Sequence, residues 1–383
     1  MRQDGQVKAL LTRFETMGIP SLDCVIYHKG ECVFRYYSGY SDEARTKPVN
    51  GRERYNVYSC SKPITCVAAL QLVEKGVLGL DDAVYEYLPE FRQLQKRCND
   101  RLEPVGGFSD LFSRNQQKQG DDRLEPVENT MTVRHLFTMT AGLTYNCSSP
   151  NLQRGKEETH GTLSTREAMK YLACDPLIFE PGTSWNYSLC HDVLAAIVEV
   201  VSGMCFGSFV KANIFDRLGM SHSTFLLPEE ELSTIAAQYR YDAETGKFNP
   251  CGPRVQICKL GTEYESGGGG CISTVDDYIK FLEALRDGDL LLKRDTIAEM
   301  TRPQIAGKAQ EVFKHPGYSY GLGVRCPKPD CGTFDYGWGG LAGAFLAVIP
   351  AFEATIFHVQ HVLASPNRNL RRELVKAFIH DLQ

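Results

Sequence analysis

Segments that favour β-strands lie at both ends of this 383-residue chain, and segments that favour helices fill its middle. Near the start, residues 23–27 and 32–37 flank a short polar turn at 28–31, which predicts an antiparallel hairpin. Because every strand needs a hydrogen-bonded partner, we expect both ends of the chain to share one antiparallel sheet. Near the end, apolar or alternating segments predict further strands at 318–324, 333–338, 344–349 and 354–359.

Apolar residues with helical spacing occupy the region between these strands and also both termini. The sequence therefore predicts the α+β class, in which residues 1–75 and 255–383 form a domain with an antiparallel sheet flanked by helices. Residues 76–254 are expected to form a mainly helical subdomain inserted into that domain. The predicted helices span residues 1–17, 59–75, 133–139, 165–173, 192–202, 206–218, 273–285 and 369–382.

A polar excursion covers residues 91–130, and the hexapeptide DRLEPV occurs in it twice, at 100–105 and 122–127. Two copies of six residues are too short for a solenoid repeat. We therefore expect either a pair of strand-like edges or a mobile lid flap at the surface.

Composition and charge exclude several classes of partner. The 47 acidic and 42 basic residues are scattered without long runs of one sign, so we expect no nucleic-acid partner. No window holds 18 consecutive apolar residues and the start lacks a signal-peptide pattern, which predicts a cytoplasmic protein with no membrane span. The sequence leaves the oligomeric state open.

The 14 cysteines are expected to be mostly reduced thiols, with Cys66 and Cys174 acting as small apolar residues inside helices. Cys326 and Cys331 are spaced like half of a metal clip, but no second pair accompanies them. Since H-E-x-x-H and tight His/Asp clusters are also absent, we expect neither a metal nor another cofactor.

The motif Ser59-Cys60-Ser61-Lys62 places a hydroxyl and an amine about one helical turn apart at the start of a helix. In a partly desolvated cleft such an amine can take the serine proton, and the helix N-terminus favours developing negative charge. Alone the motif is weak, because roughly one or two such pairs arise by chance in a chain of this length. Ser208-Phe209-Val210-Lys211 has the same spacing inside an amphipathic helix that needs no catalytic explanation.

Order and context make Ser59 the better candidate. Residues 55–63 (YNVYSCSKP), 131–143 (MTVRHLFTMTAGL), 180–188 (EPGTSWNYS) and 265–281 (ESGGGGCISTVDDYIKF) follow one another in this order. With them the chain resembles the class C β-lactamase and serine esterase branch of the penicillin-binding protein superfamily. The resemblance covers most of the chain outside the polar excursion and implies a β-lactamase/transpeptidase-like fold with Ser59 as nucleophile.

The second motif of that superfamily, usually Tyr-x-Asn, corresponds to Tyr187-Ser188-Leu189. The resemblance implies that Tyr187, its phenolate stabilised by Lys62, takes the Ser59 proton and returns it to the leaving group. Leu189 replaces the asparagine. Polar binding of an acylamino side chain, which β-lactam and peptide substrates present, is therefore not expected.

The third motif, usually Lys-Thr-Gly, corresponds to Trp338-Gly339-Gly340. An indole offers an apolar wall and one N–H donor where a cation would hold a substrate carboxylate, so neutral esters are favoured. The two glycines allow close approach of a ligand carbonyl. The backbone N–H groups of Ser59 and Leu341 would form the oxyanion hole. In these motifs the chain is similar to family VIII carboxylesterases and related acyltransferases.

The sequence therefore predicts a serine hydrolase that forms an acyl-enzyme, most simply an esterase on small neutral esters. Transfer of the acyl group to an alcohol or amine, a weak β-lactamase or D-Ala peptidase activity, and a non-catalytic binding or assembly module stay open as alternatives. The glycine run 267–270 matches no phosphate-binding pattern, and we expect close strand packing there beside the site.

Overall fold

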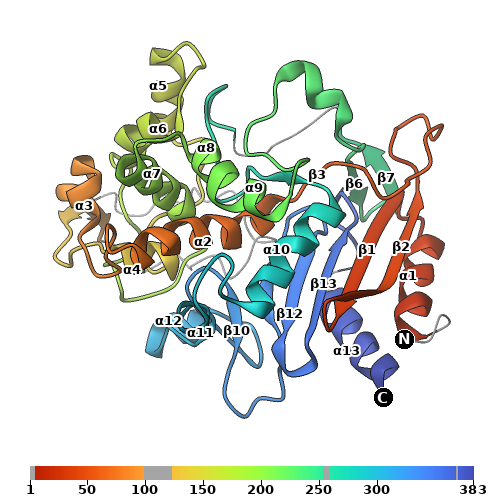
Figure 1. Ribbon diagram of the computed structural model, residues 1–383. Coiled ribbons are helices and arrows are strands. Elements are labelled where there is room, and N and C mark those ends of the chain that lie inside the picture. The colour runs from red at the N-terminus through yellow and green to blue at the C-terminus, as the bar shows by residue number, and fades with distance from the viewer. Residues whose placement is uncertain (1–4, 99–122, 253–258, 368–369) are drawn as a thin grey trace.

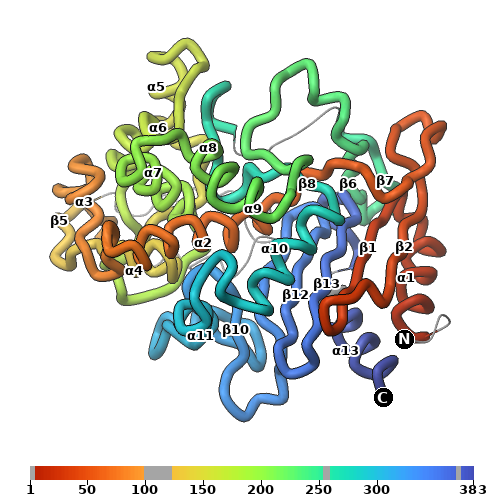
Figure 2. The backbone as a smooth tube through the Cα atoms, viewed as in Figure 1, coloured from red at the N-terminus to blue at the C-terminus, as the bar shows by residue number. Residues whose placement is uncertain are grey.

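The computed structural model describes residues 5–98, 123–252, 259–367 and 370–383. Its centre is a seven-stranded sheet of order β2-β1-β13-β12-β11-β10-β9 (Figure 1). Strand β1 (Ser21–His28) forms the predicted hairpin with β2 (Glu31–Gly39) and pairs antiparallel with β13 (Ala354–Val359). Figure 2 accordingly shows the red N-terminal strands beside the blue C-terminal ones, so the two ends of the chain share one sheet, as predicted.

The other half of the sheet comes entirely from the C-terminal part of the chain. The predicted strand at 318–324 is wrong beyond Tyr320, because the chain turns back at Gly321 and Gly323, where φ of Gly323 is +84°. A separate strand follows that turn. The strands are β9 (Tyr318–Tyr320), β10 (Arg325–Pro327), β11 (Tyr336–Gly339) and β12 (Phe345–Ile349).

Alternating residues of the sheet face two separate cores. One face packs against α1 (Gln6–Thr16) and α13 (Leu370–Leu382), with β-strand residues such as Cys24 and Ile356 between them. The other face packs against α10 (Val275–Asp287) and continues into the large core of the helical region. The period-two alternation of the strands therefore separates the two cores.

Helix α2 (Ser61–Glu74) runs through the middle of the helical region, and its residues 61–72 are all buried. A helix that is buried on every side must be surrounded by protein, and α7 (Cys190–Ser202) packs along it. The predicted helix at 206–218 is interrupted by a π-helical turn at Lys211–Phe215. The remaining α-helices of the described residues are α3 (Val84–Tyr87), α4 (Val133–Phe137), α5 (Pro150–Glu158), α6 (Thr165–Leu172), α8 (Phe206–Val210), α9 (Asp216–Leu218), α11 (Arg294–Thr301) and α12 (Gly307–Val312).

Three small sheets complete the described structure. Strand β3 (Tyr55–Asn56) pairs with β8 (Ile272–Ser273), and β14 (Val362–Leu363) pairs with β6 (Tyr239–Asp242), which pairs with β7 (Lys247–Pro250). Strand β4 (Gln95–Arg97) pairs with β5 (Leu124–Pro126). The second DRLEPV copy thus supplies a short strand, whereas the first copy lies outside the described residues. The proposed domain boundaries stay a prediction.

Within the described ranges, no single helix combines the length and hydropathy of a membrane span, although α7 and the bent segment at 206–218 pass that test as a pair.

Candidate active site

A strained turn presents Ser59. The chain leaves β3, passes through a short 3-10 turn at Tyr58–Cys60 and enters α2. Tyr58 has a φ of +48°, a left-handed conformation that is uncommon for a non-glycine residue and often marks functional sites. Its hydroxyl donates to Gln238 Oε1 at 2.6 Å, which anchors the turn. Ser59 therefore lies just before α2, within the 3-10 turn rather than on the helix itself, and is 1% exposed.

Lys62 is fully buried one turn further along and reaches back to the serine. Its Nζ lies 3.3 Å from Ser59 Oγ and donates to the carbonyl of Gly268 at 2.6 Å. Lysine is almost never fully buried unless it is paired, so this burial indicates a specific role for the amine.

Tyr187 completes a hydrogen-bonded cluster around the serine. Its hydroxyl donates to Ser59 Oγ at 2.5 Å, although 128 residues separate the two in sequence. The Tyr187 ring stacks on Trp338 with a centroid distance of 5.8 Å, and the indole N–H of Trp338 donates to the Tyr187 hydroxyl at 3.4 Å. The structure thus brings Ser59, Lys62, Tyr187 and Trp338 together.

Tyr145 is a member of this cluster that the sequence reasoning missed. Its ring stacks on the other side of Tyr187 at 5.4 Å, so Tyr187 is held between two aromatic rings. Lys62 Nζ lies 5.2 Å from the Tyr145 ring centroid and 4.6 Å from that of Tyr187, within the range of cation–π attraction. No motif marks Tyr145, because its role depends on packing between distant segments.

The end of strand β11 lies against the turn that carries Ser59. A methyl group at Gly340 would lie 2.3 Å from the carbonyl oxygen of Val57, so only glycine fits there. At Gly339 the nearest atom to such a methyl group is 3.5 Å away. The Gly340 N–H already donates to Ala344 at 2.6 Å, and Leu341 is the next residue along the chain.

Leu189 lies in a different environment from the one that its place in the motif suggested. Its side chain belongs to the large hydrophobic core and is 1% exposed, and its N–H donates to Thr144. Its predicted part in substrate binding stays a prediction.

The glycine run lies between helices α2 and α7. A methyl group at Gly267 would lie 2.4 Å from the carbonyl oxygen of His191 and 3.1 Å from Thr65 Cγ2. The run is closely packed beside the site, as expected, but the predicted strand is wrong, because residues 267–269 form a turn. His191 itself is fully buried, which lowers the pKa of its imidazole to about 3 with help from the Lys62 charge. It is therefore neutral at pH 7.

Asp192 is a second residue that the sequence reasoning missed. It is 0% exposed, and its Oδ1 accepts hydrogen bonds from Tyr264 at 2.8 Å and Ser266 at 2.6 Å. Burial raises the pKa of this carboxyl, and the hydrogen bond from Ser266 and the charge of Lys62 oppose that effect.

The part of the chain that the structure describes contains no group of three or more His, Cys, Asp or Glu residues placed to hold a metal. Cys326 is buried and Cys331 is exposed, and both are free thiols. Cys66 is buried as expected, but Cys174 is exposed because α6 ends before it.

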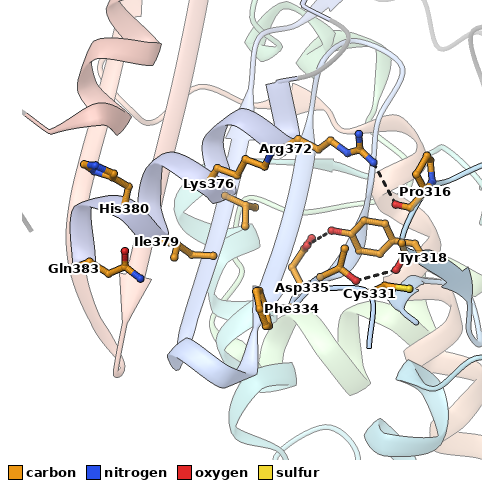
Figure 3. Close-up of a pocket in the computed structure, with 14 residues that line it drawn as sticks. Pro316, Tyr318, Cys331, Phe334, Asp335, Arg372, Lys376, Ile379, His380 and Gln383 are labelled. Carbon is orange, nitrogen blue, oxygen red and sulfur yellow. Dashed lines mark hydrogen bonds between the residues drawn. The ribbon is translucent and has the colours of Figure 1, made fainter. Parts of the chain in front are cut away.

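A separate groove of about 620 Å³ lies between α13 and the β9 end of the sheet (Figure 3). Arg372, Lys376 and His380 line one wall from α13, and Tyr318 and Phe334 lie opposite. None of the residues that surround Ser59 lines this groove.

Comparisons with known proteins show which family and which relatives the chain resembles. A family model described as Beta-lactamase matches residues 7–376. Esterase EstB from Burkholderia gladioli is 28% identical over 348 residues, which cover 83% of this chain and 80% of EstB. Acyltransferase calJ from Penicillium decumbens is 34% identical over 284 residues, which cover 70% of this chain and 60% of calJ, less than two thirds of that relative's length.

Among solved structures, EstCE1, described as a hydrolase with promiscuous acyltransferase activity, superimposes with a TM-score of 0.74. It is 22% identical, and the match covers 97% of each chain. The predicted β-lactamase/transpeptidase-like fold is thereby confirmed. With the family model matched over nearly its whole length, the chain belongs to the beta-lactamase family.

Proposed function

We propose that this chain is a serine hydrolase that forms an acyl-enzyme on Ser59 and acts as an esterase on small neutral esters. The observation that carries the proposal is the placement of Ser59 Oγ between Lys62 Nζ at 3.3 Å and Tyr187 Oη at 2.5 Å. A serine hydroxyl is a weak nucleophile unless a neighbouring base accepts its proton. Here an amine and a phenol both lie within hydrogen-bonding distance of the hydroxyl.

In the acylation step, Ser59 Oγ attacks the ester carbonyl and its proton passes to Tyr187, whose phenolate the Lys62 ammonium stabilises. The carbonyl oxygen becomes an oxyanion, which the backbone N–H groups of Ser59 and Leu341 stabilise. Loss of one such donor typically costs about 3 kcal/mol of transition-state stabilisation.

Collapse of the tetrahedral intermediate expels the alcohol, which takes the proton from Tyr187. In the second step, water gives a proton to Tyr187, attacks the acyl carbon and releases the acid, and Ser59 recovers its proton. No metal or cofactor takes part in this scheme.

Trp338 favours neutral substrates. Its indole stands where related enzymes carry a lysine for a substrate carboxylate, and it supports Tyr187 by stacking. An uncharged nitrophenyl butyrate should therefore be hydrolysed faster than an analogue with a terminal carboxylate on the acyl chain. Equal rates for the two esters would show that Trp338 does not favour neutral substrates.

Hydrolysis of nitrophenyl esters by purified protein tests the assignment of the nucleophile. Ser59→Ala should abolish turnover. Ser208→Ala is the matched control, because Ser208 has the same Ser-x-x-Lys spacing but is exposed on α8. Equal rates for wild type and Ser59→Ala would overturn the proposal.

Acyl transfer is the second candidate, favoured by the identity with the acyltransferase calJ. The first step is the same, and an alcohol or amine replaces water in the second. Product analysis with added acceptor alcohols separates the two activities. A chromogenic cephalosporin tests weak β-lactam hydrolysis, and a protein with neither turnover nor a Ser59 adduct would be a binding module.

A cytoplasmic location is part of the proposal. Twelve cysteines of the described residues are free thiols, as a reducing compartment favours, whereas Cys147 is disulfide-bonded. Cell fractionation tests this point.

A further inference from the structure

Asp192 is a buried carboxylate placed directly behind the amine of the candidate site. It is the third residue of α7 and has no exposed surface. Burying a carboxylate is costly unless hydrogen bonds and nearby positive charge compensate it. Two hydroxyl donors, those of Tyr264 and Ser266, meet its Oδ1. Oδ1 is therefore held by two donors, whereas Oδ2, which lies beside Gly268, accepts no hydrogen bond from the described residues.

Gly268 separates this carboxylate from Lys62. A methyl group at Gly268 would lie 2.4 Å from Asp192 Oδ2 and 3.4 Å from Lys62 Nζ. The Gly268 carbonyl accepts the hydrogen bond from Lys62 at 2.6 Å. One glycine thus stands between the anion and the amine.

The other groups that face Asp192 and Lys62 carry little charge. Burial raises the pKa values of Tyr145 and Tyr264 well above those of ordinary tyrosines and raises the pKa of Cys190 to about 12, so these groups are neutral at pH 7. The titratable groups facing the pair are Cys66 from α2, Cys190 and His191 from α7, Tyr264 from the segment before the glycine run, and Tyr145 and Tyr187 from the loops over the site.

We propose that Asp192 is a positioning residue of this site, which holds Lys62 against Ser59 through Gly268 and whose negative charge sets the pH range of activity. The inference rests on the proposed function. Leu189, the N-cap residue of α7, supplies no polar group where the related motif has asparagine, and Asp192 follows three residues later in the first turn of that helix. A carboxylate behind the amine stabilises the ammonium form, as nearby opposite charges do.

The negative charge of Asp192 determines the direction in which its removal moves the pH profile. Removing a buried negative charge makes nearby protons easier to lose. The pH profile of kcat/KM in Asp192→Asn should therefore move to lower pH, by about one pH unit given the intervening glycine. We also expect kcat to fall by about 10- to 100-fold with KM little changed, because the lost interaction positions the catalytic groups.

The test is the pH profile of nitrophenyl-ester hydrolysis for wild type, Asp192→Asn and Asp295→Asn, with unfolding temperatures measured in parallel. Asp295→Asn is the matched control, because Asp295 also lies in the first turn of a helix, α11, but is exposed. Its profile should coincide with that of wild type. An Asp192→Asn variant that unfolds more easily yet keeps the wild-type profile would show a merely structural role and would overturn the proposal.

Ser266→Ala and Tyr264→Phe keep the test decisive if Asp192→Asn does not fold. Each removes one donor that favours the ionised carboxyl, so each should move the profile in the same direction by a smaller amount. Unmoved profiles in both would contradict the inference. If wild type has no Ser59-dependent turnover, the proposed function fails; if wild type turns over and the profiles coincide, only the role of Asp192 fails.

Discussion

At the scale of single residues, the chemistry depends on short contacts between groups that are distant in sequence. Ser59 and Lys62 are neighbours along the chain, but Tyr187 and Trp338 reach them from a loop and a strand far away. The sequence pointed to all four residues because they stand in segments that resemble the motifs of the penicillin-binding protein superfamily, in the same order along the chain. Tyr145 and Asp192 were missed because nothing in their local sequence distinguishes them from core residues.

Tyr187→Phe tests the phenol directly. The variant keeps the ring between Tyr145 and Trp338 but loses the hydroxyl that donates to Ser59, so kcat/KM should fall by roughly 100-fold or more. Tyr320→Phe is the control, because the Tyr320 ring also packs on Trp338 and its hydroxyl has no hydrogen-bond partner among the described residues. Similar kinetics in the two variants would rule out a proton-transfer role for Tyr187.

At the scale of elements, the site depends on contacts between the end of a strand and the turn before a helix. Hydrophobic periodicity predicted the long elements α1, α2, α7, α10 and α13 and most central strands. It failed where glycines turn the chain at 321–323 and where elements of two to six residues follow tertiary contacts rather than local pattern. The short β3 and β8, which position the Ser59 turn, belong to this second group.

Gly340→Ala and Gly339→Ala form a matched pair at the end of strand β11 (Tyr336–Gly339). The methyl group of Gly340→Ala would lie 2.3 Å from the Val57 carbonyl oxygen and must push the strand end away from the Ser59 turn. The methyl group of Gly339→Ala would lie 3.5 Å from its nearest neighbour, the Ala344 carbonyl oxygen. We expect Gly340→Ala to lower kcat by at least about tenfold, as loss of oxyanion alignment would, and Gly339→Ala to lower it clearly less. Steady-state kinetics of both proteins check this, and equal effects would contradict the packing argument.

Glu199 makes the stability of the helical region depend on pH. Burial raises the pKa of this carboxyl to about 7, so the folded protein holds a proton that the unfolded chain loses above about pH 4.5. Stability should therefore fall as pH rises from about 5 to 8. Glu199→Gln should match wild type at pH 5 and be more stable by about 2 kcal/mol at pH 8, measured by urea unfolding. Parallel pH dependences in the two proteins would show that the proton is not held at Glu199.

At the scale of the whole molecule, the sheet separates the candidate site from a second core. The surroundings of Ser59 belong to the large core, whereas α1 and α13 cover the opposite face of the sheet. The antiparallel sheet shared by both chain ends was predictable, because strands at the two ends have few other partners. The side chains that converge on Ser59 were not, because that convergence depends on the three-dimensional packing of α2, α7 and β11.

Phe378→Ala tests whether the core beneath α13 contributes to stability without affecting catalysis at Ser59. Phe378 is completely buried between α13 and the sheet, so its truncation should cost about 3–5 kcal/mol of unfolding free energy. The kcat of the protein that stays folded should be unchanged. Lys376→Ala, exposed on the same helix, should alter neither quantity. Chemical unfolding and kinetics at low temperature measure both, and a large loss of kcat in folded Phe378→Ala would mean that the two cores are coupled.

The most direct test of the central claim, that the hydroxyl of Ser59 is activated by Lys62 and Tyr187, is intact-mass analysis after brief treatment with an activated phosphonate ester. We predict one adduct on wild type and on Ser208→Ala, no adduct on Ser59→Ala, and labelling of Tyr187→Phe slowed by about 100-fold. Labelling of Ser59→Ala to the same extent as wild type, or no adduct on folded wild type, would contradict the assignment.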